Sequence, residues 1–135
     1  MNLMKLNAKQ CKELRVCFFK VTPQLPTLRI DGQVLETVRS HKVLGLVIQD
    51  NLKWNENTCM IVSKAFKHLP IIRVLRRGGV SAADLLVIYV ALVRSVLEYC
   101  CVVWHNALPA HLSSEIERVQ MRALRIIYPL SLIHI

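Results

Sequence analysis

The sequence predicts an α+β fold: a small antiparallel β-sheet of three to four strands, followed by a bundle of three helices. Ahead of residue 54, apolar residues come in short runs broken by Pro, Gly and Asp, which is typical of strands joined by turns. Beyond residue 54 they recur every three or four positions, which is typical of amphipathic helices. We therefore expect two parts, residues 1–53 and 54–130, and an atypical tail at 131–135.

The first part is expected to contain a hairpin and an earlier strand. Residues 28–30 and 33–35 flank the pair Asp31-Gly32. Such a pair between two short apolar runs predicts a tight turn, because both residues tolerate positive φ. Residues 14–19 are rich in β-forming side chains and are expected to form the preceding strand.

Residues 43–48 are almost continuously apolar and are expected to form the last strand. Gly45 interrupts them, which predicts a β-bulge or a close approach by another backbone. A glycine would let nucleic acid come near, since no side chain blocks it. Relief of strand twist explains the same glycine equally well. Trp54 follows, and either packs between helix and sheet or stacks on a base.

The first predicted helix covers residues 55–77. Its apolar positions share one face, and Lys64 and Lys67 fall on the opposite face. Pro70 should kink or split this helix, because proline removes one backbone donor. Three arginines crowd the last turn, where the helix dipole favours cations. They are Arg73, Arg76 and Arg77.

The second predicted helix runs from Ser81 to about Trp104, with Ser81 as its capping residue. One apolar stripe is expected along it, formed by Leu85, Tyr89, Leu92, Val96, Cys100 and Val103. The third helix is expected to begin at a capping box, Ser114 to Glu117, and to end near Tyr128, ahead of Pro129.

The third helix carries a row of arginines. Arg118, Arg122 and Arg125 are spaced by four and three, so they share one face. Glu115 can pair with Arg118, but Arg122 and Arg125 have no acidic residue three or four positions away. The row is either a solvated charged face or a surface that contacts phosphates.

The composition indicates which classes of partner the chain is expected to bind. Eighteen Lys and Arg against nine Asp and Glu give a net charge of +9, which favours a polyanionic partner such as nucleic acid or an acidic membrane surface. Yet 53% of residues are hydrophobic and only 20% are charged, so the chain has more apolar surface than it can bury alone. A membrane span over residues 85–104 is disfavoured, because Arg94 and Glu98 lie inside that window.

No catalytic or metal site is predicted. The acidic residues are scattered, and no pair of aspartates stands on a strand and turn to hold two metal ions. The five cysteines are odd in number and lack a Cys-x-x-Cys pair, so a zinc site is not expected. An odd cysteine count without a signal segment favours a reducing, intracellular location, in the cytoplasm, the nucleus or both.

Several segments, in order, resemble the reverse transcriptases of non-LTR (Jockey-like) retrotransposons. Residues 42–48 and Trp54 are similar to that family's "LG…W" block, which includes the primer grip. Residues 2–18 and 26–36 resemble the end of the palm. Residues 84–109 and 116–127 resemble the thumb helices, whereas residues 131–135 depart from the family pattern.

The resemblance implies the C-terminal edge of the palm followed by a thumb-like three-helix bundle. The family's catalytic aspartates would precede Met1, so this chain would hold the template–primer duplex (RNA or DNA) without doing the chemistry. The missing palm and fingers would be its other partner, and Mg²⁺ would belong to the parent polymerase, with no cofactor bound here. The residues expected to bind nucleic acid are Lys42, Gly45, Lys53, Trp54, Lys64, Lys67, Arg73, Arg76, Arg77, Arg118, Arg122 and Arg125.

Two other function classes remain open. One is a free-standing basic helical module that binds nucleic acid or another protein and has no polymerase origin. The other is a membrane-associated helical protein, suggested by the apolar window at residues 85–104. We expect no membrane partner, because Arg94 and Glu98 lie inside that window.

Overall fold

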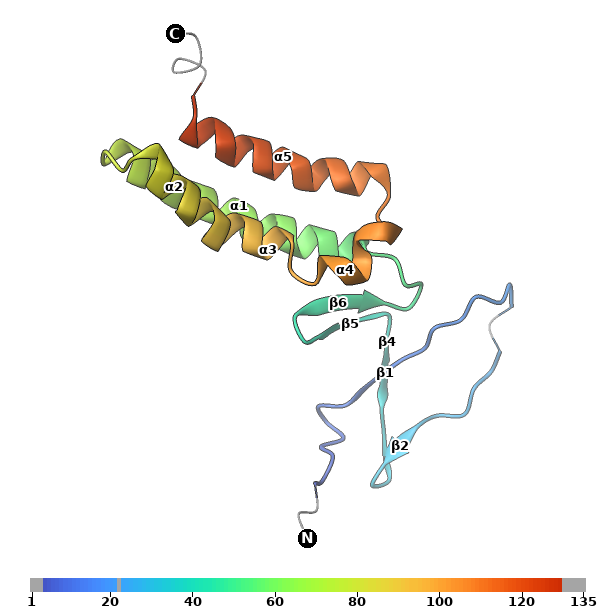
Figure 1. The fold of residues 1–135 in the computed structure, drawn as a ribbon. Coiled ribbons are helices and arrows are strands. Elements are labelled where there is room, and N and C mark those ends of the chain that lie inside the picture. The colour runs from blue at the N-terminus through green and yellow to red at the C-terminus, as the bar shows by residue number, and fades with distance from the viewer. Residues whose placement is uncertain (1–3, 22, 130–135) are drawn as a thin grey trace. The chain divides into compact units, whose positions relative to one another are not determined.

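A computed structural model describes residues 4–21 and 23–129 (Figure 1). Helix accounts for 51% and strand for 14%, so the fold mixes the two, as the sequence predicts. The chain divides into two compact units, a strand unit through Trp54 and a helical unit from Asn55, which are described separately below. The tail expected at 131–135 lies outside the described residues.

The strand unit contains three two-stranded sheets instead of the predicted single antiparallel sheet. β2 (Arg29–Ile30) and β3 (Gln33–Val34) form the expected hairpin. Its turn is Asp31-Gly32, whose φ angles of 51° and 77° are both positive. The Asp-Gly pair was sufficient to predict this hairpin, because the turn and both strands lie within six consecutive residues.

The strand predicted at residues 14–19 is wrong in position, because β1 covers Lys12–Leu14 and shares only Leu14 with it. β1 pairs in parallel with β4 (Glu36–Val38). Lys12 forms an ion pair with Glu36 across this ladder. The hydroxyl of Thr37 donates a hydrogen bond of 3.3 Å to the carboxylate of Glu13, which also pairs with Arg15. These side chains hold together two strands that are far apart in the sequence.

The predicted strand at residues 43–48 is wrong, because the chain reverses direction inside it. β5 (Ser40–Val43) and β6 (Leu46–Gln49) form an antiparallel hairpin in which Val43 lies opposite Leu46. Leu44 and Gly45 are the two turn residues, with φ of 50° and 86°. Positive φ at both positions is the requirement of a type I′ turn. Gly45 therefore permits a turn and forms no bulge within a strand.

α1 (Asn55–Arg77) confirms the first predicted helix, but Pro70 does not split it. The residues on either side explain this continuity. Leu69 and Ile72 are both buried in the core of the helical unit, so packing holds the helix through the position where the proline donor is missing.

The second predicted helix is interrupted. It comprises α2 (Ala82–Tyr89), a π-helical turn η1 (Val90–Arg94), α3 (Ser95–Leu97), α4 (Cys101–Trp104) and a 3-10 turn η2 (His105–Ala107). Ser81 caps it as predicted, accepting a hydrogen bond of 3.3 Å from the backbone of Asp84. Cys100 adopts a left-handed conformation with φ of 51°, which separates α3 from α4.

The π-helical turn changes which residues are buried. After Leu85 and Tyr89 the core positions are Val93 and Leu97, four residues apart each time. The predicted stripe instead continued through Leu92 and Val96, as a regular helix requires. A π turn holds more residues than an α turn, so it advances the buried face by one position. Val103, also predicted on that stripe, is 55% exposed.

α5 (Ala110–Ile127) begins four residues earlier than predicted and ends ahead of Pro129 as expected. The proposed capping box is wrong, since Ser114 lies inside the helix and its hydroxyl donates a hydrogen bond of 2.9 Å to the carbonyl of Ala110. α5 contributes Val119, Ala123 and Ile127 to the core shared with α1, α2, η1 and α3.

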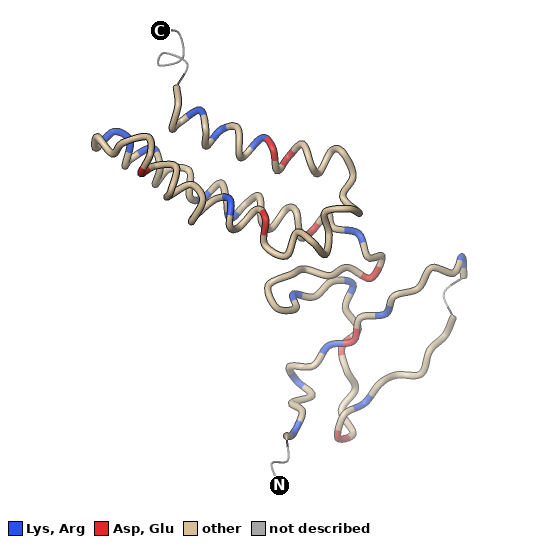
Figure 2. The backbone as a smooth tube through the Cα atoms, viewed as in Figure 1, with Lys and Arg blue, Asp and Glu red and all other residues tan. Residues whose placement is uncertain are grey.

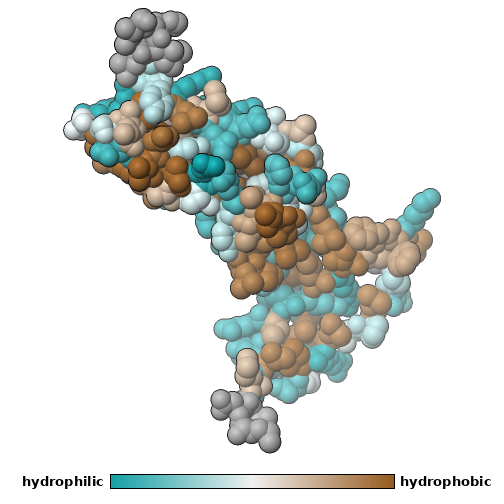
Figure 3. Space-filling model, viewed as in Figure 1, coloured by the Kyte–Doolittle hydropathy of each residue, from teal (hydrophilic) through white to brown (hydrophobic). Residues whose placement is uncertain are grey.

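Many large apolar side chains remain exposed. Within the helical unit, Leu86, Val87 and Val90 are exposed on α2 and the start of η1. Figure 3 shows that hydrophobic residues reach the surface in several places. Across the described residues no single helix has the length and apolar character to cross a membrane. The segments Ala82–Leu97 and Cys101–Ala107 meet that requirement only jointly, and they are bent by 41°.

Candidate nucleic-acid interface

The candidate interface lies where α1 and α5 pack side by side (Figure 1). Both helices run in the same direction. Phe66, in the middle of α1, contacts Arg122, and the end of α1 lies beside Arg125, one turn later in α5. The arginines that end α1 and the arginine row of α5 are therefore on neighbouring surfaces (Figure 2).

Arg122 is held by an aromatic ring. Its guanidinium carbon lies 5.5 Å from the centroid of the Phe66 ring, the geometry of a cation–π contact. Phe66 and Arg73 are seven positions apart, so they share a face of α1. This contact places Arg122 of α5 against the face of α1 that also carries Arg73.

Four arginines line a shallow cleft at the C-terminal ends of the two helices. Arg73, Arg76 and Arg77 come from α1, and Arg125 comes from α5 together with Ile126. The cleft has a volume of about 500 Å³, and none of the described residues that line it is acidic. We call this group the arginine cleft.

In the part of the chain that the structure describes, no carboxylate pairs with the arginines of this surface. The three ion pairs found among the described residues involve Lys12, Arg15 and Arg94, and none involves an arginine of the cleft. The pair that spacing allows between Glu115 and Arg118 is also absent from the part of the chain that is described. The guanidinium donors of the cleft are thus open to an anion from outside.

The remaining residues predicted to bind nucleic acid lie elsewhere. Lys64 and Lys67 are exposed on α1, but Lys64 is nine positions from Arg73, which places it about half a turn away around the helix. The other four belong to the strand unit. They are Lys42 on β5, Gly45 in the turn of the second hairpin, Lys53 after β6 and Trp54 at the end of the unit.

Trp54 is buried, with 9% of its surface exposed, which favours a packing role over stacking on a base. Lys53 is exposed, and its backbone donates a hydrogen bond of 2.9 Å to the side chain of Asn51.

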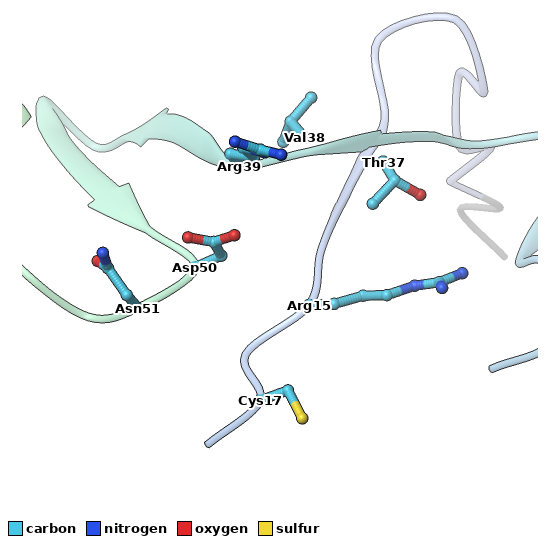
Figure 4. A pocket seen from close by; sticks show the side chains of 7 residues that line it. All are labelled: Arg15, Cys17, Thr37, Val38, Arg39, Asp50 and Asn51. Atoms are coloured by element: carbon cyan, nitrogen blue, oxygen red, sulfur yellow. The ribbon is translucent and has the colours of Figure 1, made fainter. Parts of the chain in front are cut away.

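The strand unit has a cavity of its own, of about 370 Å³. Arg15, Arg39 and Asp50 supply its charged groups, and Cys17 lies at its edge (Figure 4). Arg15 is already engaged by Glu13, and this hydrogen bond lowers the pKa of the Glu13 carboxyl. Among the described residues that line this cavity there is no histidine that could act as a base for Cys17.

Among the described residues, no group of three His, Cys, Asp or Glu side chains is placed to hold a metal ion. The five cysteines are free thiols. Burial raises the pKa of the Tyr89 hydroxyl, which belongs to the core of the helical unit.

Sequence reasoning identified the arginines but not their grouping. Helical spacing predicts Phe66 on the apolar face of α1 with the other apolar residues, and nothing in the spacing predicts its contact with Arg122. The available signal was that two helices end in arginines, at Arg77 and at Arg125. Comparisons with protein-family models, curated proteins and solved structures find no significant match to this chain.

Proposed function

We propose that this chain holds nucleic acid through the α1–α5 surface, as the thumb-like part of an RNA-directed DNA polymerase of the non-LTR retrotransposon type. The helical unit would be the thumb bundle and the strand unit the edge of the palm. The observation that carries the binding function is the group of arginines along α1 and α5 that lacks acidic partners among the described residues. The polymerase origin rests on the sequence resemblance alone.

The chemistry of this surface suits a phosphate backbone. Arginine presents five donors in a planar fork that pairs with phosphate oxygens in a bidentate way. Contacts of this kind position a protein on nucleic acid but read no bases. We therefore expect binding with little sequence preference and with an affinity that falls steeply as salt rises.

The first test is a titration of the full chain with a duplex at several salt concentrations. Replacing Arg118, Arg122 and Arg125 with glutamine should flatten the dependence of log K on log salt by about 2 to 3 units, since each phosphate contact contributes about 0.9. The control variant K64Q/K67Q lies away from the seam and should change the slope by less. An unchanged slope in the triple variant would remove these arginines from the site.

The second test concerns the chemistry. The chain should bind a primer–template without extending it when dNTPs and Mg²⁺ are supplied, because the catalytic aspartates of the family would lie outside it. Extension by the purified chain would overturn the assignment. Preference for anionic lipid vesicles over the duplex would favour the membrane alternative instead.

A further inference from the structure

We propose that the arginine cleft is a discrete subsite that takes two adjacent phosphate groups of one nucleic-acid strand. This inference rests on the proposed function for the class of ligand, and goes beyond it by separating the cleft from the rest of the basic surface. The cleft joins the ends of two helices, whereas Arg118 and Arg122 lie along one helix.

The number of charges in the cleft argues for more than one phosphate. Four arginines line a volume of about 500 Å³, and no carboxylate from the described residues lines it. A phosphodiester carries a single negative charge, so one such group would leave most of this charge uncompensated. Two linked phosphates would engage donors from both helices, with Arg73 or Arg77 on one side and Arg125 on the other.

The arginine row on α5 leads toward the cleft. Arg118 and Arg125 are seven residues apart, or about 10.5 Å along the helix. One strand of a duplex advances about 3.4 Å per phosphate along the duplex axis, so a duplex lying with its axis along α5 would present roughly three phosphate steps over this distance. A strand that follows the row would therefore reach the cleft at one end, next to Arg125.

A purely structural role predicts a different behaviour. Cations near helix C-termini offset the partial negative charge of the last carbonyl groups. If that were the purpose of these arginines, replacing them would lower stability. However, no hydrogen bond between their guanidinium groups and another residue is found in the described chain. Four converging cations should instead repel one another until an anion binds.

The experiment uses inorganic pyrophosphate, the smallest probe with two linked phosphates, and orthophosphate as the single-phosphate comparison. We expect pyrophosphate to bind the full chain with a stoichiometry of one and about tenfold or more tighter than orthophosphate, measured by calorimetry. R73Q/R125Q, which removes one cation from each helix, should weaken pyrophosphate binding at least tenfold. K64Q/K67Q removes the same charge outside the cleft and should leave it within about twofold.

The thermal midpoint of unfolding provides a second readout. Without anion, R73Q/R125Q should unfold at the same or a higher temperature than the unaltered chain, and pyrophosphate should raise the midpoint of the unaltered chain only. Equal binding of both anions, equal loss in both variants, or a lowered midpoint for R73Q/R125Q without anion would overturn the proposal.

The two proposals fail differently. If the duplex binds with a steep salt dependence but pyrophosphate does not bind saturably, the subsite is wrong and the nucleic-acid function stands. If pyrophosphate binds the cleft while duplex and single-stranded oligonucleotides do not, the proposed function is wrong and the ligand is a smaller polyphosphate.

Discussion

Leu44 is a leucine in a backbone conformation that L-residues rarely adopt. It has a φ of 50° and its side chain is 88% exposed, so no burial offsets a conformation that costs an L-residue about 1–2 kcal/mol. Asparagine tolerates this conformation and is favoured ahead of glycine in type I′ turns.

The substitution L44N should therefore stabilise the β5–β6 hairpin by about 1 kcal/mol. Hydrogen exchange of the hairpin amides measures this directly, and protection should increase about fivefold. The control K42N places the same side chain on β5, where asparagine is a poor strand former, and should reduce protection. A fall in protection for L44N would mean that the turn is not of the type described.

At the scale of elements, the π-helical turn decides which side chains form the core. Val93 is fully buried, whereas Leu92 is only half-buried, although a regular helix would have placed Leu92 on the packed stripe. V93A should lower the free energy of unfolding by about 2 kcal/mol, and L92A by less, even though L92A removes more carbon. Chemical denaturation of both variants measures which one loses more free energy of unfolding. The reverse order would indicate a regular α-helix through this segment.

Local patterns predicted the elements whose signals lie within a few residues. The hairpin at Asp31-Gly32 and the span of α1 are both confirmed, because turn residues and helical periodicity act over short distances. The pairing of β1 with β4 had no local signal, since Lys12 and Glu36 are 24 residues apart. The π turn was missed because a shift of one position leaves an almost equally apolar stripe.

At the scale of the whole molecule, net charge and apolar surface act against each other. The charge of +9 keeps copies of the chain apart, and exposed groups such as Val87 and Val90 draw them together. The sequence predicted this excess of apolar surface from composition. The composition could not show which apolar side chains are exposed, because the π-helical turn decides which side chains of the second predicted helix face the core.

The salt concentration should shift the balance between charge repulsion and apolar attraction. The Debye length falls from about 30 Å at 0.01 M to about 3 Å at 1 M, so repulsion between chains is screened while apolar attraction is not. Free of nucleic acid, the chain should be monomeric at low salt and self-associate as salt rises, which sedimentation velocity measures. V87S/V90S should move association to higher salt, because it removes two apolar side chains that are 68% and 44% exposed. The variant K64Q/K67Q should move association to lower salt, since it removes two positive charges. A chain that stays monomeric at 1 M salt would show that the exposed valines do not drive association.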